Sequence, residues 1–109
     1  MQTFRPGEIV IVVFPFTDQR GTKRRPVLVL FDSGDEDIVV ARVTSQPIRT
    51  MYDVEIVDWR QAGLLLPSVA RVHKVVTLEK RLIERRLGML TASDWAQVRA
   101  RLQQLWSSI

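Results

Sequence analysis

The 109-residue sequence contains no cysteine and a single histidine. The first absence excludes disulfide bonds and thiolate metal sites, and the second excludes a metal site built from several histidines. No apolar run is long enough to span a bilayer, and the first residues show no signal-peptide pattern. We therefore expect a cytoplasmic protein with no metal, no other cofactor and no membrane partner.

The sequence also lacks the short motifs of several enzyme classes. It has no glycine-rich phosphate loop, no regular spacing of metal ligands and no Gly-x-Ser-x-Gly motif. The spacing of its serine, histidine and aspartate residues does not suggest a catalytic triad. Function must therefore be sought in charge and in local clusters of polar residues.

An apolar fraction of 46% predicts a folded core, and the length fits a single domain over residues 1–109. The net charge of +4 is unevenly distributed. Residues 1–30 carry five cations and two acids, residues 31–70 three cations and seven acids, and residues 71–109 eight cations and three acids. The basic ends indicate a nucleic-acid-binding surface, provided that the fold brings them together.

Five segments rich in β-branched residues predict strands. They cover residues 8–14, 27–31, 38–43, 53–57 and 68–78. Between them we expect a polar hairpin loop over residues 16–25, a turn over 32–37 and a short helical segment over 58–66. Short, closely spaced strands with tight turns favour a small barrel over a βαβ fold.

The hydrophobic period changes near the C-terminus. Thr91 is followed three residues later by Asp94, which is typical of a helix start. Apolar residues then recur at helical spacing: Trp95, Val98, Leu102, Leu105 and Trp106. We expect this helix to pack its apolar stripe, both tryptophans included, on the barrel. The predicted fold is therefore mainly β with a C-terminal α-helix.

Three consecutive cations, Lys23, Arg24 and Arg25, follow a glycine-opened turn and precede Pro26. Like charges repel, so three adjacent cations on a turn add nothing to the stability of the fold. An anionic partner such as a phosphate would explain them, and loops between rigid elements often carry functional residues. The alternative is a solvated turn that aids solubility.

A second cluster of polar groups follows the third predicted strand. Thr44, Ser45 and Gln46 offer two hydroxyls and an amide, which can hold phosphate oxygens or position a ribose. The alternative is an ordinary hydroxyl-rich turn before Pro47.

Arg71 and His73 are two residues apart in the fifth predicted strand, so their side chains are expected on one face. A guanidinium beside an imidazole is sensible if an anion bridges them. Histidine can exchange a proton near neutral pH, which arginine cannot do readily. The alternative is a half-exposed histidine with a structural hydrogen bond.

Three motifs in order give the chain a family likeness over nearly its whole length. They are Pro6-Gly7-Glu8-Ile9-Val10 with Phe14-Pro15-Phe16 and Arg24-Arg25-Pro26-Val27, then Val43-Thr44-Ser45-Gln46, and then Gly63-Leu64 with Pro67-Ser68-Val69-Ala70-Arg71-Val72 and Leu87-Gly88-Met89-Leu90. With these motifs the chain resembles the MazF/PemK toxins of bacterial type II toxin–antitoxin systems.

The resemblance implies a small SH3-like β-barrel of the CcdB/MazF type with a C-terminal helix, acting as a homodimer. It implies a metal-independent, sequence-selective endoribonuclease that cleaves single-stranded RNA such as mRNA and is inhibited by a cognate antitoxin. The RNA's own 2′-hydroxyl acts as nucleophile, which leaves a 2′,3′-cyclic phosphate and a 5′-hydroxyl.

The resemblance also implies roles for individual residues. Arg25 and Thr44 match the catalytic pair of the MazF pattern, and Arg71 matches an arginine of the PemK branch. His73 stands where that branch has an aspartate, and it is the natural candidate for proton transfer. We predict RNA contacts at five further residues: Thr17, Lys23, Arg24, Ser45 and Gln46.

A different class of function would fit the same fold. Small barrels also serve as non-catalytic binding modules, and a relative of this toxin fold inhibits gyrase by protein contact. The chain would then bind nucleic acid or protein without cutting, or be an inactive toxin relative. Cleavage of RNA in the presence of EDTA distinguishes the two classes.

Overall fold

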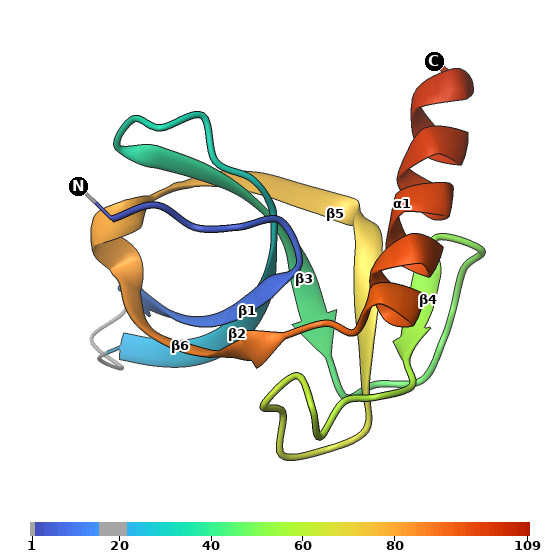
Figure 1. The fold of residues 1–109 in the computed structure, drawn as a ribbon, viewed down its shortest axis with the longest axis horizontal. Coiled ribbons are helices and arrows are strands. Elements are labelled where there is room, and N and C mark those ends of the chain that lie inside the picture. The colour runs from blue at the N-terminus through green and yellow to red at the C-terminus, as the bar shows by residue number, and fades with distance from the viewer. Residues whose placement is uncertain (1, 16–21) are drawn as a thin grey trace.

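The computed structural model describes residues 2–15 and 22–109. Its elements are β1 (Glu8–Pro15), β2 (Thr22–Phe31), β3 (Asp37–Thr44), β4 (Asp53–Ile56), β5 (Ser68–Glu79), the 3₁₀ turn η1 (Lys80–Leu82), β6 (Ile83–Met89) and α1 (Ala92–Ser107). The strands form one antiparallel sheet in the order β4-β5-β3-β2-β1-β6. This sheet is strongly curled, and α1 stands beside β4 and β5 (Figure 1).

This architecture confirms the prediction of a mainly β fold with a C-terminal helix. Within the part of the chain that the structure describes, the edge strands β4 and β6 do not pair, so the curled sheet is not closed. The β-branched run of β1 explains its central place, because Ile9 and Val10 are both fully buried on opposite faces of the strand.

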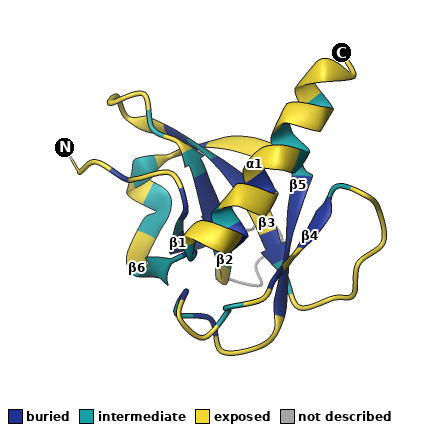
Figure 2. Ribbon diagram, turned by 45° about the vertical axis from the view of Figure 1, so that its right-hand side comes forward, coloured by how far each residue is buried: buried dark blue, intermediate teal, exposed yellow. Residues whose placement is uncertain are grey.

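Two apolar clusters make up the core. One lies beneath α1 and contains Ile9, Leu28 and Val98, with Trp95 packed against it. The other joins β1, β2 and β3 through Val10, Val29 and Val40, with Phe4 from the N-terminal segment. Figure 2 shows the buried segments gathered in the central strands. The sheet is therefore packed against apolar side chains on both faces, which favours fixed positions for the side chains at its strand ends.

The second strand is longer than predicted. It begins at Thr22, so Lys23, Arg24 and Arg25 lie on β2 and not on a loop. The sequence interpretation placed these cations in the loop over residues 16–25 and began the strand at Val27, after Pro26. Proline cannot donate to a strand ladder and is rare inside central strands. In the structure, Pro26 pairs with Ile11 of β1, whereas pairing with β3 starts only at Val27. Pro26 is thus tolerated where β2 has a neighbour on one side only.

Two other elements differ from the sequence prediction. Residues 83–89 form the edge strand β6, which was not expected because charged residues interrupt its apolar pattern. Residues 58–66 form no helix and instead make irregular turns with isolated backbone bonds, such as Leu64 N–H to the Trp59 carbonyl at 3.0 Å.

The segment 57–67 is held at its start and near its middle. Asp94 of α1 accepts hydrogen bonds from the N–H groups of Val57 (3.1 Å) and Asp58 (2.9 Å). Gly63 has a positive φ of 83°, and a Cβ added there would collide with the backbone of Leu87. Glycine is therefore needed for this segment to lie against β6, where its leucines form one wall of the candidate site.

The helix begins as predicted, because the Thr91 hydroxyl accepts the Asp94 N–H at 3.3 Å. Its packing was predicted only in part. Trp95 packs on the core, but Trp106 is 71% exposed because the last turns of α1 extend beyond the sheet (Figure 1). Among residues 2–15 and 22–109, no helix is long and apolar enough to cross a membrane.

Candidate RNA-binding and cleavage site

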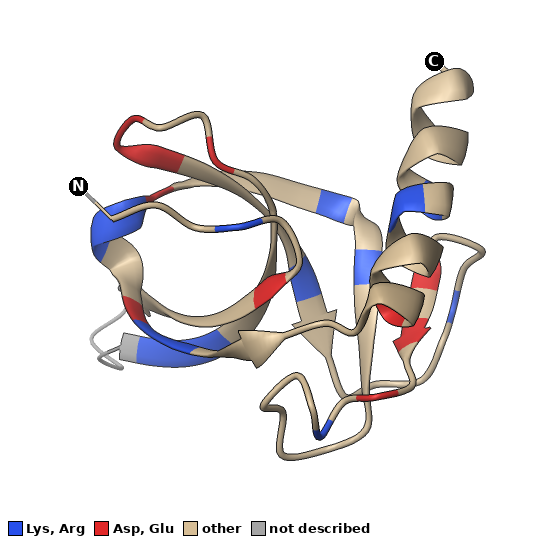
Figure 3. Cartoon of the chain, viewed as in Figure 1, with Lys and Arg blue, Asp and Glu red and all other residues tan. Residues whose placement is uncertain are grey.

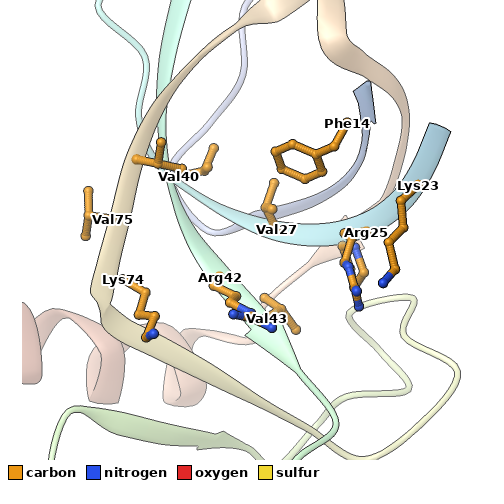
Figure 4. Close-up of a pocket in the computed structure, with 11 residues that line it drawn as sticks. Phe14, Lys23, Arg25, Val27, Val40, Arg42, Val43, Lys74 and Val75 are labelled. Atoms are coloured by element: carbon orange, nitrogen blue, oxygen red, sulfur yellow. The ribbon is translucent and has the colours of Figure 1, made fainter. Parts of the chain in front are cut away.

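A cationic pocket of about 570 Å³ opens between β2, β3 and β5. Four positive side chains line it: Lys23, Arg25, Arg42 and Lys74. Apolar side chains that include Phe14 and Val27 line the rest of the pocket (Figure 4). Among the residues that the structure describes, no acidic side chain lines this pocket. Such a surface attracts an anion and offers its apolar parts a place to pack.

A smaller cavity of about 250 Å³ shares Arg25, Pro26, Arg42 and Val43 with this pocket. Its lining adds Thr44 and Ser45 at the end of β3. The opposite wall consists of Leu64, Leu65 and Leu66 from the segment anchored by Gly63, with Leu87 of β6. The structure therefore brings together Arg25 and Thr44, the predicted catalytic pair, although they are far apart in the sequence.

Strand alternation separates the three consecutive cations. Lys23 and Arg25 line the pocket, whereas Arg24 extends away from it and forms an ion pair with Glu84 of β6 at 2.9 Å. The exposed cations of β2 and β3 are marked in Figure 3. Two of the three cations are thus available to a ligand in this pocket, and the third is neutralised within the fold.

Thr44 is the last residue of β3 and is held by the chain that follows it. Its Oγ1 accepts the backbone N–H of Gln46 at 3.2 Å. This bond uses a lone pair of the oxygen and not the hydroxyl hydrogen, which therefore remains able to donate. Thr44 can therefore donate to an oxygen of a ligand bound beside Arg25.

Arg71 and His73 lie apart from this pocket, around the buried carboxylate of Asp53. Arg71 Nη1 is 3.4 Å from Asp53 Oδ2, and His73 Nδ1 is 4.0 Å from Asp53 Oδ1. The anion that the sequence required between these two side chains is therefore supplied by the chain itself. Asp53 was not singled out from the sequence, because nothing local connects it with residues almost twenty positions away.

Burial by itself would raise the pKa of Asp53. The N–H groups of Arg49 and Thr50, the positive charge of Arg71 and the neighbouring His73 together outweigh this effect, so the net pKa is lowered from 3.8. Asp53 is thus an anion at neutral pH. Its partner Arg71 has a side chain that is only 6% exposed, so this arginine is directed toward the protein interior and not toward solvent.

His73 lines a third cavity, an apolar groove of about 350 Å³ that also contains Leu102, Leu105 and Trp106 of α1. The four predicted catalytic residues thus fall into two places, with Arg25 and Thr44 in one and Arg71 and His73 in the other. Thr17, a predicted RNA contact, lies outside the described residues. Across residues 2–15 and 22–109 no three acidic, histidine or cysteine side chains are grouped as a metal site requires.

Residues 5–106 match the family model of the PemK-like, MazF-like toxins of type II toxin–antitoxin systems. The chain belongs to this family. The match covers every element of the sheet and nearly all of the helix.

Several solved structures share the fold of this chain. The chain is similar to a chain of a MazE–MazF complex (form II) from Deinococcus radiodurans, with 22% identity over 100% of both chains and a TM-score of 0.80. Form III of that complex gives 26% identity over 93% and 94% of the two chains and a TM-score of 0.72. An endoribonuclease from a mycobacterial species gives 15% identity over 98% and 94%, with a TM-score of 0.75. Comparison with curated proteins gave no match.

Sequence reasoning missed three side chains around the sites of this PemK/MazF-like domain: Arg42, Asp53 and Lys74. Arg42 and Lys74 are isolated cations in strands, and only the sheet brings them beside Arg25. The sequence offered one usable signal for Arg42, because a charged side chain within the apolar stretch from Ile38 to Val43 is rarely buried without a partner, and Arg42 is indeed exposed.

Proposed function

We propose that this chain is the toxin of a type II toxin–antitoxin system and acts as a metal-independent, sequence-selective endoribonuclease on single-stranded RNA. The observation that carries the proposal is the pocket in which Arg25 and Thr44 meet beside further cations, in a member of the PemK/MazF-like family. A similar solved chain is described as an endoribonuclease, and another as an endoribonuclease in complex with its cognate antitoxin.

The partners follow from the same proposal. RNA binds through its phosphates to Lys23, Arg25, Arg42 and Lys74, with Ser45 following β3. Whether Gln46 contacts RNA, as the sequence predicted, or positions Thr44 is tested below. A cognate antitoxin binds the toxin and inhibits it. The toxin acts as a homodimer in the cytoplasm. Single-stranded RNA is favoured because an A-form duplex hides its base edges and restricts in-line attack.

Cleavage begins with attack of the ribose 2′-hydroxyl on the adjacent phosphate. The O2′–P bond forms and the P–O5′ bond breaks, which leaves a 2′,3′-cyclic phosphate and a 5′-hydroxyl. Arg25 stabilises the additional negative charge of the phosphorane, and the Thr44 hydroxyl donates to one of its oxygens. Both groups are held by the sheet before substrate arrives.

Two protons must also move in this reaction. The 2′-hydroxyl loses one, and the departing 5′-oxygen gains one. The described side chains that line the smaller cavity include arginines and hydroxyls but no base that works near neutral pH. We therefore assign both transfers to water in this pocket, with Arg25 stabilising the charge that develops. The sequence-based proposal that His73 moves a proton stays a prediction, and it is tested below.

The proposal is tested by incubating the purified chain with single-stranded RNA in excess EDTA and analysing the fragment ends. We expect fragments with 2′,3′-cyclic phosphate and 5′-hydroxyl ends, and no such fragments with Thr44→Val. Binding of RNA without any cleavage would favour a non-catalytic module. Cleavage only after addition of a divalent metal would contradict the proposed chemistry.

A further inference from the structure

Asp53 is a buried carboxylate at the end of the segment that joins β3 to β4. Its side chain is fully buried, and its Oδ2 accepts the N–H groups of Arg49 at 2.8 Å and of Thr50 at 3.2 Å. Arg71 Nη1 approaches the same oxygen at 3.4 Å. Burial of an ion pair is costly and often contributes little to stability. The pair therefore invites an explanation beyond stability.

The hydrogen bonds of Arg71 lead from this carboxylate to the candidate site. Arg71 Nη2 donates to Oε1 of Gln46 at 3.3 Å. The backbone N–H of Gln46 donates to Oγ1 of Thr44 at 3.2 Å. One buried carboxylate thus reaches the β3–β4 segment at three points: directly at residues 49 and 50, and through Arg71 at Gln46.

We propose that Asp53 and Arg71 are positioning residues for RNA cleavage: they hold Gln46, and Gln46 fixes the hydroxyl of Thr44 beside Arg25. This inference rests on the proposed function. It gives Arg71 a different role from direct contact with the phosphate, since its side chain is buried and both of its terminal nitrogens are engaged. Small errors in the placement of a catalytic group lower the rate strongly, which gives such a device its value.

The contacts that run from Asp53 through Arg71 and Gln46 to Thr44, here called the relay, can be broken at an exposed or at a buried position. Gln46→Ala removes the acceptor of Arg71 at an exposed residue and should leave the fold intact. Asp53→Asn keeps the shape of the side chain but removes its charge. Met51→Ala is the matched control, because Met51 lies in the same segment and is 57% exposed.

Steady-state cleavage of one defined RNA is measured for each variant over a range of RNA concentrations. We expect Gln46→Ala and Asp53→Asn each to lower kcat about tenfold with KM within about twofold, because the lost contact orients Thr44 and does not bind substrate. The double variant should lose little more than either single one, since both act on one relay. Met51→Ala should match the parent.

Other outcomes overturn the inference. A rise in KM at constant kcat for Gln46→Ala would show that Gln46 contacts RNA directly. Additive losses in the double variant would show that Asp53 and Gln46 act separately. If Asp53→Asn does not fold, Gln46→Ala is combined instead with Arg71→Lys, which keeps the positive charge beside Asp53 but lacks the second nitrogen that donates to Gln46. The single and double variants are then compared in the same way.

A second measurement separates this inference from the proposed function. Amide hydrogen exchange of Gln46 is followed in the parent and in Asp53→Asn, without RNA. We expect exchange at Gln46 to become at least about tenfold faster in the variant, because the bond to Thr44 loses its support. Unchanged exchange overturns the relay even if the chain cleaves RNA. Faster exchange in a chain that never cleaves RNA refutes the proposed function alone.

Discussion

Arg25 and Arg71 occupy strands of one sheet, yet their surroundings are opposite. Arg25 is exposed and lines a pocket with three other cations and, among the described residues, no acid. Arg71 is buried, and Asp53 neutralises it within the fold. A cation that the protein leaves unneutralised is available to an external anion, whereas one that is paired and buried acts on the protein itself. The same residue type therefore serves two purposes, and substitutions should separate them.

The largest expected effect is on stability, for Arg71→Ala. Removing Arg71 leaves the Asp53 carboxylate buried without its charge partner, so we expect unfolding to become easier by about 3–5 kcal/mol. Urea denaturation followed by circular dichroism measures this loss. A loss below about 1 kcal/mol, the value of an exposed ion pair, would contradict the buried role of Arg71.

Arg25→Ala should lower the rate of RNA cleavage and leave the stability of the fold unchanged. The fold should remain intact because Arg25 is exposed. The cleavage rate should fall about 10²–10³-fold because a preorganised charge contact is lost. Arg24→Ala is the matched control, since Arg24 is the adjacent arginine on the same strand and pairs with Glu84. We expect this control to cut RNA within about threefold of the parent. Equal losses for both variants would rule out a special role for Arg25.

Acid should destabilise the fold through Asp53. Its pKa is lowered from 3.8, so the folded state holds this proton less tightly than the unfolded state does. The resulting stability is present above pH 3.8 and is lost as the pH falls through the lower folded-state value. The lowered pKa values of Asp32 and Asp35 act in the same direction, so the comparison must be made with Asp53→Asn. We expect the parent to lose stability more steeply than this variant below about pH 4. The free energy of unfolding is measured by urea denaturation at a series of acid pH values. If it falls equally with pH in the parent and in Asp53→Asn, Asp53 does not contribute to the acid sensitivity.

The sequence predicted much of this fold for clear physical reasons. β-Branched runs identified β1, β3, β4 and β5, and the pairing of Thr91 with Asp94 identified the start of α1. The failures occurred where tertiary contacts decide. Pro26 continues β2 because one side of the strand is free, and β6 is a charged edge strand stabilised by pairing with β1.

The site was predictable only where its residues are close in the sequence. The cation run at Lys23–Arg25 and the polar end of β3 at Thr44 could be found without the fold. That Arg25 and Thr44 line one cavity depends on the order of the strands in the sheet. The pairing of Asp53 on β4 with Arg71 on the neighbouring β5 depends on it too. Single-residue patterns carry no information about such long-range pairing, so the split of the predicted catalytic residues into two places was not foreseeable.

Lys74→Ala tests the wider cationic pocket. Losing one phosphate contact should raise KM several-fold and reduce the slope of log KM against log salt concentration by about 0.7, the value for one contact to single-stranded nucleic acid. The value of kcat should stay within about twofold, because Lys74 lies in the larger pocket and not in the smaller cavity with Thr44. Arg60→Ala removes one charge elsewhere, where Arg60 stacks on Trp59 at 4.8 Å, and serves as the control. An equal change in salt slope for both variants would indicate general charge effects only.

The smallest effect is expected for His73→Gln, and it decides between two accounts of proton transfer. If His73 were the general base, the variant would lose about 10²-fold or more in rate, and the acid limb of the pH–rate profile would flatten. The structure instead places His73 against Asp53, with Arg71 on the same carboxylate, the Tyr52 ring 6.1 Å away and apolar residues of α1 across the groove. None of these residues lines the cavity of Arg25 and Thr44, so we expect the cleavage rate of His73→Gln to stay within about threefold of the parent at every pH.

His73→Asp introduces a second carboxylate beside Asp53 and should destabilise the fold without raising activity above that of His73→Gln. A large loss for His73→Gln, with partial recovery in His73→Asp, would instead make His73 a proton carrier and require the RNA to reach both cavities in the working enzyme.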